Sequence, residues 1–437
     1  MQGQTRAWGN EVVYHLFVDR FRNGNPALNV RPASFHFHGQ PVAVSQNKRE
    51  LTGDRTHQHT FYNGDLQGIR DALPYLQELG VTVVLLTPIF ASRSTHRYDT
   101  DDYLRLDPHV GTDEDFRALV DDLHSRGMKL ALDGVFGHTS FEHPWYRDPA
   151  LRKKHYRLKP DGNAETWLGW GVLPKLDTDD PETQDKLLEV IDRWPGVDAW
   201  RLDAAQHLPA SFLRRFRERL KAQNPHAIVI AEEWEAVPTQ LRDGLYDGVL
   251  NFQFRRPVVD FFRGEIGAET MVRRLSAYLD AYPPEALRHC WNLLDNHDTE
   301  RYFGHHAHDA RRLRLALALQ ILLPGTPQLY YGNEIGMTAR DSHAARAPMV
   351  WEPRKWDRSV RAAYDEFLGL RRAHAVFDEG GLRWVHASNR TKTVAFVRES
   401  DTARALVAVN AGDYDETLDF EGERILVKAQ DTRVVFA

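Results

Sequence analysis

The sequence has only one cysteine, Cys290, among its 437 residues. A single thiol cannot form a disulfide within the chain, so the fold depends on its core. No apolar run reaches the roughly 18 residues that a membrane-spanning helix needs, and Met1 to Arg6 are not followed by the apolar segment of a signal peptide. We therefore expect a cytoplasmic protein without a membrane partner.

Excess positive charge is missing as well. Lysine and arginine together number 56 against 62 acidic residues, which leaves a net charge of −6 and argues against a nucleic-acid partner. Low-complexity segments, long linkers and close repeats are also absent. Hydrophobic residues make up 42% and charged residues 27%, as in ordinary globular proteins, and the length allows a large core.

What the sequence does contain is a regular alternation of short apolar segments and amphipathic helices. The apolar segments are nearly continuous, as strands buried on both faces of a parallel sheet are. Eight of them lie at residues 11–18, 81–88, 129–136, 196–203, 227–231, 248–252, 291–294 and 327–331. Helices are expected between them, among others at 66–79, 112–127, 181–194 and 209–223. Eight such units over about 375 residues predict an α/β protein with a (β/α)8 barrel.

Two parts of the chain depart from this alternation. Residues 138–180 are polar and aromatic and interrupt the pattern after the third strand. Beyond about residue 380 the segments alternate between apolar and polar residues, as at 393–397 and 405–409, which is typical of antiparallel strands. We predict a catalytic barrel of residues 1–137 and 181–378, an inserted domain of residues 138–180, and a C-terminal β domain of residues 379–437.

Polar residues gather where the predicted barrel strands end. In such barrels the chemistry lies at these carboxyl ends. Placing several carboxylates at one end of a barrel costs free energy, since like charges raise each other's pKa, so such a cluster is expected to have a function. This favours a carboxylate-based enzyme. The residues concerned are Asp133 and His138 after the third strand, Arg201 and Asp203 in the fourth, Glu232, Glu233 and Trp234 after the fifth, and Asn296, His297 and Asp298 after the seventh.

Within the fourth strand, Arg201 and Asp203 point to the same face because side chains alternate along a strand. A neighbouring guanidinium favours the ionised form of a carboxyl group, so Arg201 is expected to keep Asp203 ionised. An ionised, oriented aspartate can act as a covalent nucleophile or as an electrostatic stabiliser. From this stretch alone, a structural ion pair is an equally good interpretation.

Four of these segments resemble the signature regions of the α-amylase family of retaining glycoside hydrolases (family 13). They are residues 133–138, 196–207, 232–234 and 296–298, and the stretches 86–90, 96–100, 103–111 and 324–334 are similar to the same family. The resemblance therefore spans nearly the whole chain. Residues 173–177 and 63–68 resemble the branch of neopullulanases, cyclomaltodextrinases and maltogenic amylases.

Two features differ from that branch. The barrel is expected to begin near residue 11, without the N-terminal starch-binding module common in the branch. A monomer is therefore favoured over the dimer that forms through this module. Gln206 and His207 resemble a plain α-amylase more than the Asn-Glu pair typical of the branch, which leaves the acceptor side of the site open.

The resemblance implies that Asp203 is the nucleophile, Glu232 the general acid/base and Asp298 the stabiliser of the transition state. Retaining hydrolysis needs two carboxyl groups about 5–5.5 Å apart, one ionised and one protonated. Strand parity alone cannot choose between Glu232 and Glu233. The Glu-x-Trp match chooses Glu232 and leaves Glu233 as a partner to a neighbouring strand or loop.

The resemblance also implies a set of substrate-binding residues. Tyr98 would stack on the sugar being cleaved, His138 and His297 would hydrogen-bond its hydroxyl groups, and His96 would lie beside Tyr98. Asp133 is expected to anchor Arg201. Three further residues are expected around the neighbouring sugars: Asp341 and Arg346 as a clamp on the next sugar, and His207 on the acceptor side, with a purely local backbone role as its alternative.

Calcium is the one metal that the resemblance raises. Many relatives bind it through an asparagine at the position of Gly137, which has no side-chain oxygen, so that site is not expected. A second calcium loop matches Asn23, Asn25, Asn29, the Asn63 carbonyl and Asp65. Only Asp65 supplies a full charge, whereas tight calcium sites usually use several carboxylates. We therefore expect no required cofactor, with calcium at these five residues as the less favoured alternative.

The expected activity is hydrolysis of α-1,4-glucosidic bonds in maltooligosaccharides or cyclodextrins with retention, accompanied by transglycosylation. The expected partner is accordingly a small α-glucan oligosaccharide. One alternative is an α-glucosidase or glucosyl isomerase acting on trehalose, sucrose or isomaltose. Another is a non-catalytic carbohydrate-binding barrel, which the complete set of three carboxylates disfavours.

Overall fold

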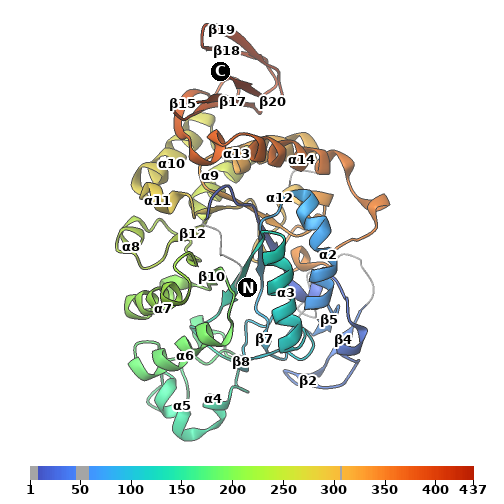
Figure 1. Cartoon of the computed structure of the whole chain (residues 1–437), viewed down its shortest axis with the longest axis vertical. Coiled ribbons are helices and arrows are strands. Elements are labelled where there is room, and N and C mark those ends of the chain that lie inside the picture. The colour runs from blue at the N-terminus through green and yellow to red at the C-terminus, as the bar shows by residue number, and fades with distance from the viewer. Residues whose placement is uncertain (1–7, 46–58, 306–307) are drawn as a thin grey trace.

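The computed structural model describes residues 8–45, 59–305 and 308–437, so residues 1–6, on which the signal-peptide prediction depends, lie outside it. Its centre is a closed barrel of eight parallel strands (Figure 1). The strands are β1 (Val13–Leu16), β6 (Val83–Leu86), β9 (Lys129–Gly134), β10 (Ala199–Leu202), β11 (Ile228–Ala231), β12 (Gly248–Asn251), β13 (Trp291–Asn292) and β14 (Thr326–Tyr330). All eight overlap the predicted segments, and the barrel prediction is confirmed.

The barrel closes because each strand pairs with the next along the chain and β14 pairs with β1. Apolar side chains fill its interior, among them those of Val13, Val83 and Ile230. The opposite faces of the same strands pack against the surrounding helices in a larger core. Burial on both faces explains why the strand segments are nearly continuous in apolar residues.

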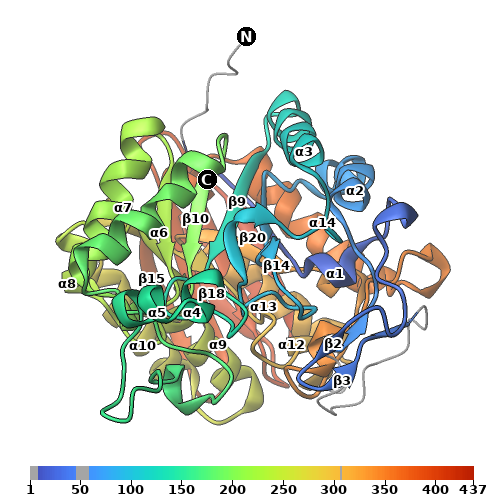
Figure 2. The ribbon, with the colours of Figure 1, turned by 90° about the horizontal axis from the view of Figure 1, so that it is seen from below.

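Helices surround the barrel on its outer side (Figure 2). Local signals set several of their ends: Thr112 and Asp115 form a capping box before α3, and Gly80, with a φ of 91°, ends α2. The helices are α1 (Val18–Phe21), α2 (Leu66–Leu79), α3 (Asp113–Ser125), α6 (Pro181–Arg193), α7 (Ala210–Gln223), α8 (Pro238–Arg242), α9 (Phe252–Arg263), α10 (Ala268–Ala281), α11 (Pro284–Leu287), α12 (Tyr302–His305), α13 (Ala310–Leu322), α14 (Arg358–Ala373) and α15 (Val376–Glu379). None of the helices in the described part of the chain is long and apolar enough to cross a membrane.

The segment after β9 projects from the barrel and carries α4 (Pro144–Arg147) and α5 (Pro149–His155) at one end of the molecule (Figure 1). Isolated bridges from His138 to Lys175 and from Tyr156 to Leu176 fasten its two ends together. Short strand pairs lie elsewhere in the loops: β2 (His36–Phe37) with β3 (Gln40–Pro41), β4 (Ala43–Val44) with β5 (Thr60–Phe61), and β7 (Phe90–Ala91) with β8 (Asp102–Leu106).

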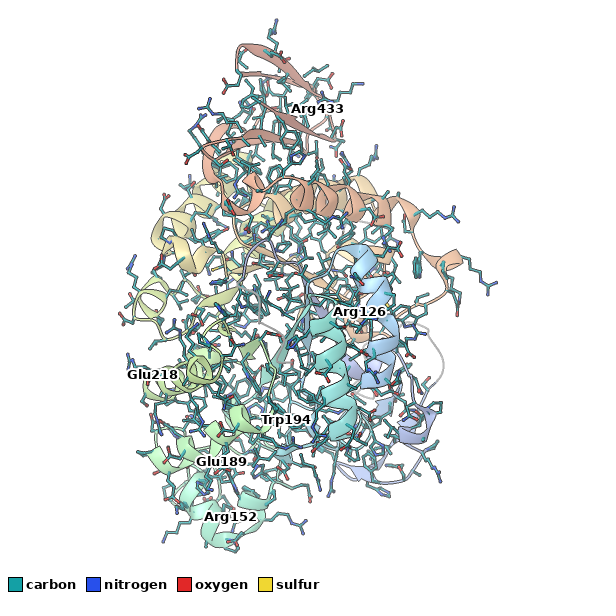
Figure 3. All side chains as sticks on the ribbon, viewed as in Figure 1. Arg126, Arg152, Glu189, Trp194, Glu218 and Arg433 are labelled. Carbon is teal, nitrogen blue, oxygen red and sulfur yellow. The ribbon has the colours of Figure 1, made fainter. Side chains whose placement is uncertain are left out.

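The last part of the chain is antiparallel, as predicted. Strands β15 (Gly381–Ser388), β16 (Thr393–Glu399), β17 (Arg404–Asn410) and β20 (Asp431–Phe436) form one sheet, and β18 (Glu416–Phe420) pairs with β19 (Glu423–Val427). Figure 3 shows Arg433 of β20 and Arg152 of α5 at opposite ends of the molecule, with Trp194 between them. The boundaries predicted at residues 138, 181 and 379 stay predictions.

Candidate active site

A cavity of about 350 Å³ lies at the carboxyl ends of the barrel strands. It brings together nine of the eleven residues predicted for catalysis and sugar binding: His96, Tyr98, His138, Asp203, His207, Glu232, His297, Asp298 and Arg346. Arg201 does not line the cavity but contacts residues that do. The eleventh, Asp341, is exposed and outside the lining, where its Oδ1 accepts hydrogen bonds from two main-chain N–H groups of its own turn.

Arg201 is the electrostatic centre of the site and is fully buried. Its Nη1 lies 2.7 Å from Asp133 Oδ1 and 2.8 Å from Asp203 Oδ1, and its Nη2 lies 2.8 Å from Glu232 Oε2. The register of β9 and β10, which places Arg201 opposite Asp133, produces the first contact. One guanidinium therefore forms ion pairs with three carboxylates. The expected role of Asp133 as the anchor of Arg201 agrees with the first of these contacts.

Sharing one cation changes the protonation of Asp203. Burial raises the pKa of Asp203 well above its usual range; Arg201 opposes this, while Glu232, Asp133 and Asp298 raise the pKa further. The expectation that Arg201 keeps Asp203 ionised is therefore wrong for this site, because burial raises the pKa more than Arg201 lowers it and the neighbouring carboxylates add to the rise. Asp203 therefore keeps its proton to a higher pH than an isolated aspartic acid would.

Ala204 directly follows Asp203 and binds Glu232, the residue after β11. Its main-chain N–H donates a hydrogen bond of 2.9 Å to Glu232 Oε2. To direct this N–H, Ala204 adopts a left-handed conformation with φ 44° and ψ 49°, which is uncommon for a residue with a side chain and is often found at functional sites. Nothing in the sequence around Ala204 indicated this role.

The surroundings of Asp298 lower its pKa, whereas those of Asp203 raise it. Its Oδ2 lies 3.0 Å from His297 Nε2, and its Oδ1 accepts a hydrogen bond of 3.1 Å from Arg346 Nη2. Burial works against ionisation here too, but His297, Arg346 and Arg201 outweigh it and hold the pKa of Asp298 well below its usual range. Arg346 also donates to the His297 carbonyl at 2.9 Å, so it orients the pair.

Tyr98 contacts three histidines of the same cavity. The Tyr98 hydroxyl donates to Asp133 Oδ2 at 2.7 Å, and its ring stacks on His297 with centroids 5.1 Å apart. His138 Nε2 lies 3.0 Å from the Tyr98 carbonyl, which can only accept, so Nε2 carries the proton and Nδ1 is an acceptor. Burial lowers the pKa of His138 to about 4, so its ring is neutral near pH 7. His96 Nδ1 accepts the main-chain N–H of Tyr98 at 3.1 Å.

Glu233 faces away from these groups, towards the loop before β12. Its Oε1 accepts a hydrogen bond of 3.2 Å from the hydroxyl of Tyr246, and burial raises the pKa of Glu233 to about 7. Its neighbour Trp234 stacks on Phe252 with ring centroids 3.9 Å apart and also lines the cavity. This arrangement agrees with the interpretation that Glu233 is a partner to a neighbouring loop.

The cavity also contains residues that the sequence reasoning missed. Trp167, Leu168, Trp170 and Leu173 come from the segment after β9, and Gln206 follows β10. The only signal for Trp167, Leu168 and Trp170 was the aromatic composition of residues 138–180, which does not say which side chains face the barrel. Leu173 lies in the stretch 173–177 that resembles the neopullulanase branch.

Four of the five residues considered for calcium have side-chain oxygens that already accept hydrogen bonds within the protein. Both carboxylate oxygens of Asp65 accept hydrogen bonds from main-chain N–H groups, at 2.6 to 3.1 Å. The side-chain oxygen of Asn29 accepts from Asn23 at 2.9 Å, and those of Asn25 and Asn63 accept main-chain N–H groups at 3.1 and 2.9 Å. Calcium requires six to eight oxygen ligands. Within the residues that the structure describes, no group of three or more His, Cys, Asp or Glu could hold a metal ion.

Comparison with known proteins identifies the family. Residues 15–167 and 166–375 match the model described as "Alpha amylase, catalytic domain". The chain is 37% identical to neopullulanase 2 of Thermoactinomyces vulgaris over 424 residues, which are 93% of this chain and 70% of the relative. It is 32% identical to the intracellular maltogenic amylase of Bacillus subtilis (strain 168) over 426 residues, 94% of this chain and 70% of the relative.

Among solved structures, the ligand-free cyclic alpha-maltosyl-(1→6)-maltose hydrolase from Arthrobacter globiformis is similar, with a TM-score of 0.90 at 29% identity, and 98% of each chain is covered. The chain belongs to the α-amylase family of glycoside hydrolases. Within that family it is an enzyme of the cyclomaltodextrinase and neopullulanase type, as its sequence predicted.

Proposed function

We propose that this enzyme hydrolyses α-1,4-glucosidic bonds of maltooligosaccharides and cyclodextrins with retention, and that it also transfers sugars to other sugars. The observation that carries the proposal is the bridging of Asp203 and Glu232 by the two Nη atoms of Arg201, each at 2.8 Å. This holds two carboxyl groups close together, as retaining hydrolysis requires.

In the first step, Asp203 in its ionised form attacks the anomeric carbon and forms an ester bond while the glycosidic bond breaks. Glu232 gives its proton to the departing oxygen, so the leaving sugar departs as an alcohol. In the second step, water gives a proton to Glu232 and attacks the anomeric carbon, which breaks the ester and restores Asp203. When a sugar hydroxyl takes the place of water, the product is a transglycosylated oligosaccharide.

The positive charge that develops on the sugar in both steps is stabilised by the ionised Asp298, whose low pKa keeps it charged. His138 supports the sugar through Nδ1, which is buried, has no partner among the described residues and can accept a hydrogen bond from a sugar hydroxyl. We further propose that Tyr98 and His297 contact the same sugar, and that Arg346 acts mainly by orienting Asp298.

A second candidate substrate is cyclic α-maltosyl-(1→6)-maltose. The similarity to the Arthrobacter hydrolase, which extends over 98% of both chains, favours it. The name of that enzyme describes a ring in which maltose units are joined by (1→6) bonds. This ring therefore differs from a cyclodextrin in its linkages. Product analysis separates them.

The proposed mechanism uses no cofactor. Glu232 transfers the proton, and Asp298 stabilises the positive charge on the sugar. A cytoplasmic location, which matches the name of the intracellular Bacillus relative, and a monomeric state stay predictions. So does the clamp role of Asp341, whose side chain lies outside the cavity lining.

The test is product analysis after incubation with maltooligosaccharides, cyclodextrin, cyclic maltosyl-maltose, pullulan, trehalose and sucrose. We expect turnover on the first three, and turnover confined to the two disaccharides would support the alternative of a disaccharide enzyme. Asp203→Asn should lower turnover by at least about a thousandfold without lowering the unfolding midpoint. Asp419→Asn, on an exposed position of β18, is the matched control. Retained activity of the Asp203 variant would overturn the assignment.

A further inference from the structure

A second cavity, of about 310 Å³, lies where the barrel meets the C-terminal β domain. Residues of α10, α11 and β15 line it, and α10 packs against β15 (Figure 1). Two other lining residues, Arg288 and Gly325, come just before β13 and β14, at the amino ends of the barrel strands. Asp203 and Glu232 follow the carboxyl ends of β10 and β11. The second cavity is therefore at the opposite end of the barrel from the catalytic one.

The walls of this second cavity are fixed by buried hydrogen bonds. The Arg398 guanidinium is fully buried and donates to main-chain carbonyls at the end of α13, in α15 and just before β15, at 2.7 to 2.8 Å. Pro324, Gly325, Gly380 and Gly381 add little side-chain volume to the lining, so the space between the walls stays open. Small-molecule sites are likewise usually pre-formed, with volumes of about 300 to 1,000 Å³.

Part of the lining is apolar. It consists of Leu279, Leu287, Leu382 and Trp384. The Trp384 ring is held edge-on against Phe396, with centroids 5.5 Å apart. Its indole N–H is buried and has no hydrogen-bond partner among the described residues. A buried indole N–H usually has a partner, so a ligand in the cavity can supply the missing acceptor.

Charged groups of both signs line the same cavity without pairing. Arg288, Asp280 and Glu379 are exposed at its edge, and within residues 8–45, 59–305 and 308–437 their side chains form no ion pair or hydrogen bond. Elsewhere exposed charges of this chain do pair, as Arg314 and Glu366 do at 2.7 Å. The two carboxylates suit hydroxyl donors and the guanidinium suits an acceptor. A neutral molecule rich in hydroxyl groups satisfies both without burying a charge of its own.

We propose that this cavity is a second, non-catalytic site for an α-glucan. A glucose ring packs its apolar C–H face on Trp384, while its hydroxyl groups exchange hydrogen bonds with Asp280, Glu379 and Arg288. The choice of a glucan as the ligand rests on the proposed function. A glucan long enough to reach both ends of the barrel would stay attached to the enzyme after one cleavage, because the second contact raises its effective concentration at the first.

The test counts binding sites in the Asp203→Asn variant, which consumes the ligand at most slowly. Titration calorimetry with maltotriose should show two ligands per chain, one of them in the catalytic cavity. Adding Trp384→Ala should weaken the second site by at least about tenfold, the size of a lost ring contact, and leave the affinity of the catalytic cavity within roughly twofold. Trp384→Phe, which keeps a ring, should retain most of the binding.

Arg288→Met removes the guanidinium at an exposed position and should weaken the second site by about tenfold too, which keeps the test valid if Trp384→Ala does not fold. Val385→Ala is the matched control, because Val385 is the next residue of β15 and is 40% exposed but does not line the cavity. It should bind two ligands as before.

Three results would overturn the inference: a single ligand per chain in Asp203→Asn, a second site that survives both Trp384→Ala and Arg288→Met, or equal weakening of both sites in both variants. A failure of the proposed function is distinguishable from these. In that case the wild-type enzyme cleaves no maltooligosaccharide, although the titration still finds maltotriose in the second cavity.

Discussion

Glu233 offers a direct test of the electrostatics at the edge of the site. Burial raises the pKa of this carboxyl group from an ordinary value of 4.5 to about 7, although Tyr246 donates a hydrogen bond to it. In the unfolded chain the group would lose its proton near its ordinary pKa. Between the two values the folded protein therefore binds a proton that the unfolded chain has lost, and the free energy of unfolding falls as the pH rises.

The magnitude follows from the two pKa values. They differ by about 2.5, and each unit of pKa corresponds to about 1.4 kcal/mol, so the full effect is about 3 kcal/mol. Glu233→Gln keeps the shape and an acceptor for the Tyr246 hydroxyl but cannot ionise. We expect the variant to match the wild type near pH 4 and to be more stable by about 3 kcal/mol at pH 8.

Urea unfolding measured at intervals from pH 4 to pH 8 gives the difference between the two proteins at each pH. Glu235→Gln is the control, because Glu235 lies two residues further on with 79% of its side chain exposed. A stability difference that does not change with pH would refute the reasoning. It would show that Glu233 ionises as freely in the folded protein as in the unfolded chain.

Two further changes test how the elements are held. Thr112→Ala removes the capping box that Thr112 forms with Asp115 before α3, and urea unfolding should show a loss of about 1 kcal/mol, with Thr112→Ser near the wild type. Arg398→Met leaves main-chain carbonyls at the end of α13, in α15 and just before β15 without their donor, and should cost about 3 to 5 kcal/mol. Arg383→Met, at an exposed position of β15, should change little, and an equal loss there would contradict the role given to Arg398.

The barrel was predictable because its strands carry a signal that does not depend on distant residues. A strand buried on both faces must be apolar almost throughout, so segments such as those of β6 and β11 stand out. Chain order then limits how parallel strands can be arranged, and helices between them favour a closed barrel. The exact ends were less predictable: β13 is only Trp291–Asn292, although the apolar run continues to Leu294.

The site was predictable as a set of residues but not as an electrostatic system. Sequence spacing pairs Arg201 with Asp203, because both lie on one strand. The pairing of Arg201 with Asp133 and Glu232 arises only when three strands lie side by side. Burial in that cluster, with the added carboxylates, reverses the expected direction of the Asp203 pKa. The left-handed Ala204 and the outward Trp170 have no local pattern that would reveal them.

Closure of the barrel through β1 and β14 has a consequence for how the chain is made. Val13 pairs with Gln328, 315 residues further along the chain. At a synthesis rate of about 5 to 20 residues per second, β1 has to wait roughly 15 to 60 s on the ribosome for that partner. During this time its other edge presents unpaired main-chain groups, which can pair with foreign strands. The enzyme's yield in a cell should therefore depend on how well this one strand is shielded before residue 330 appears.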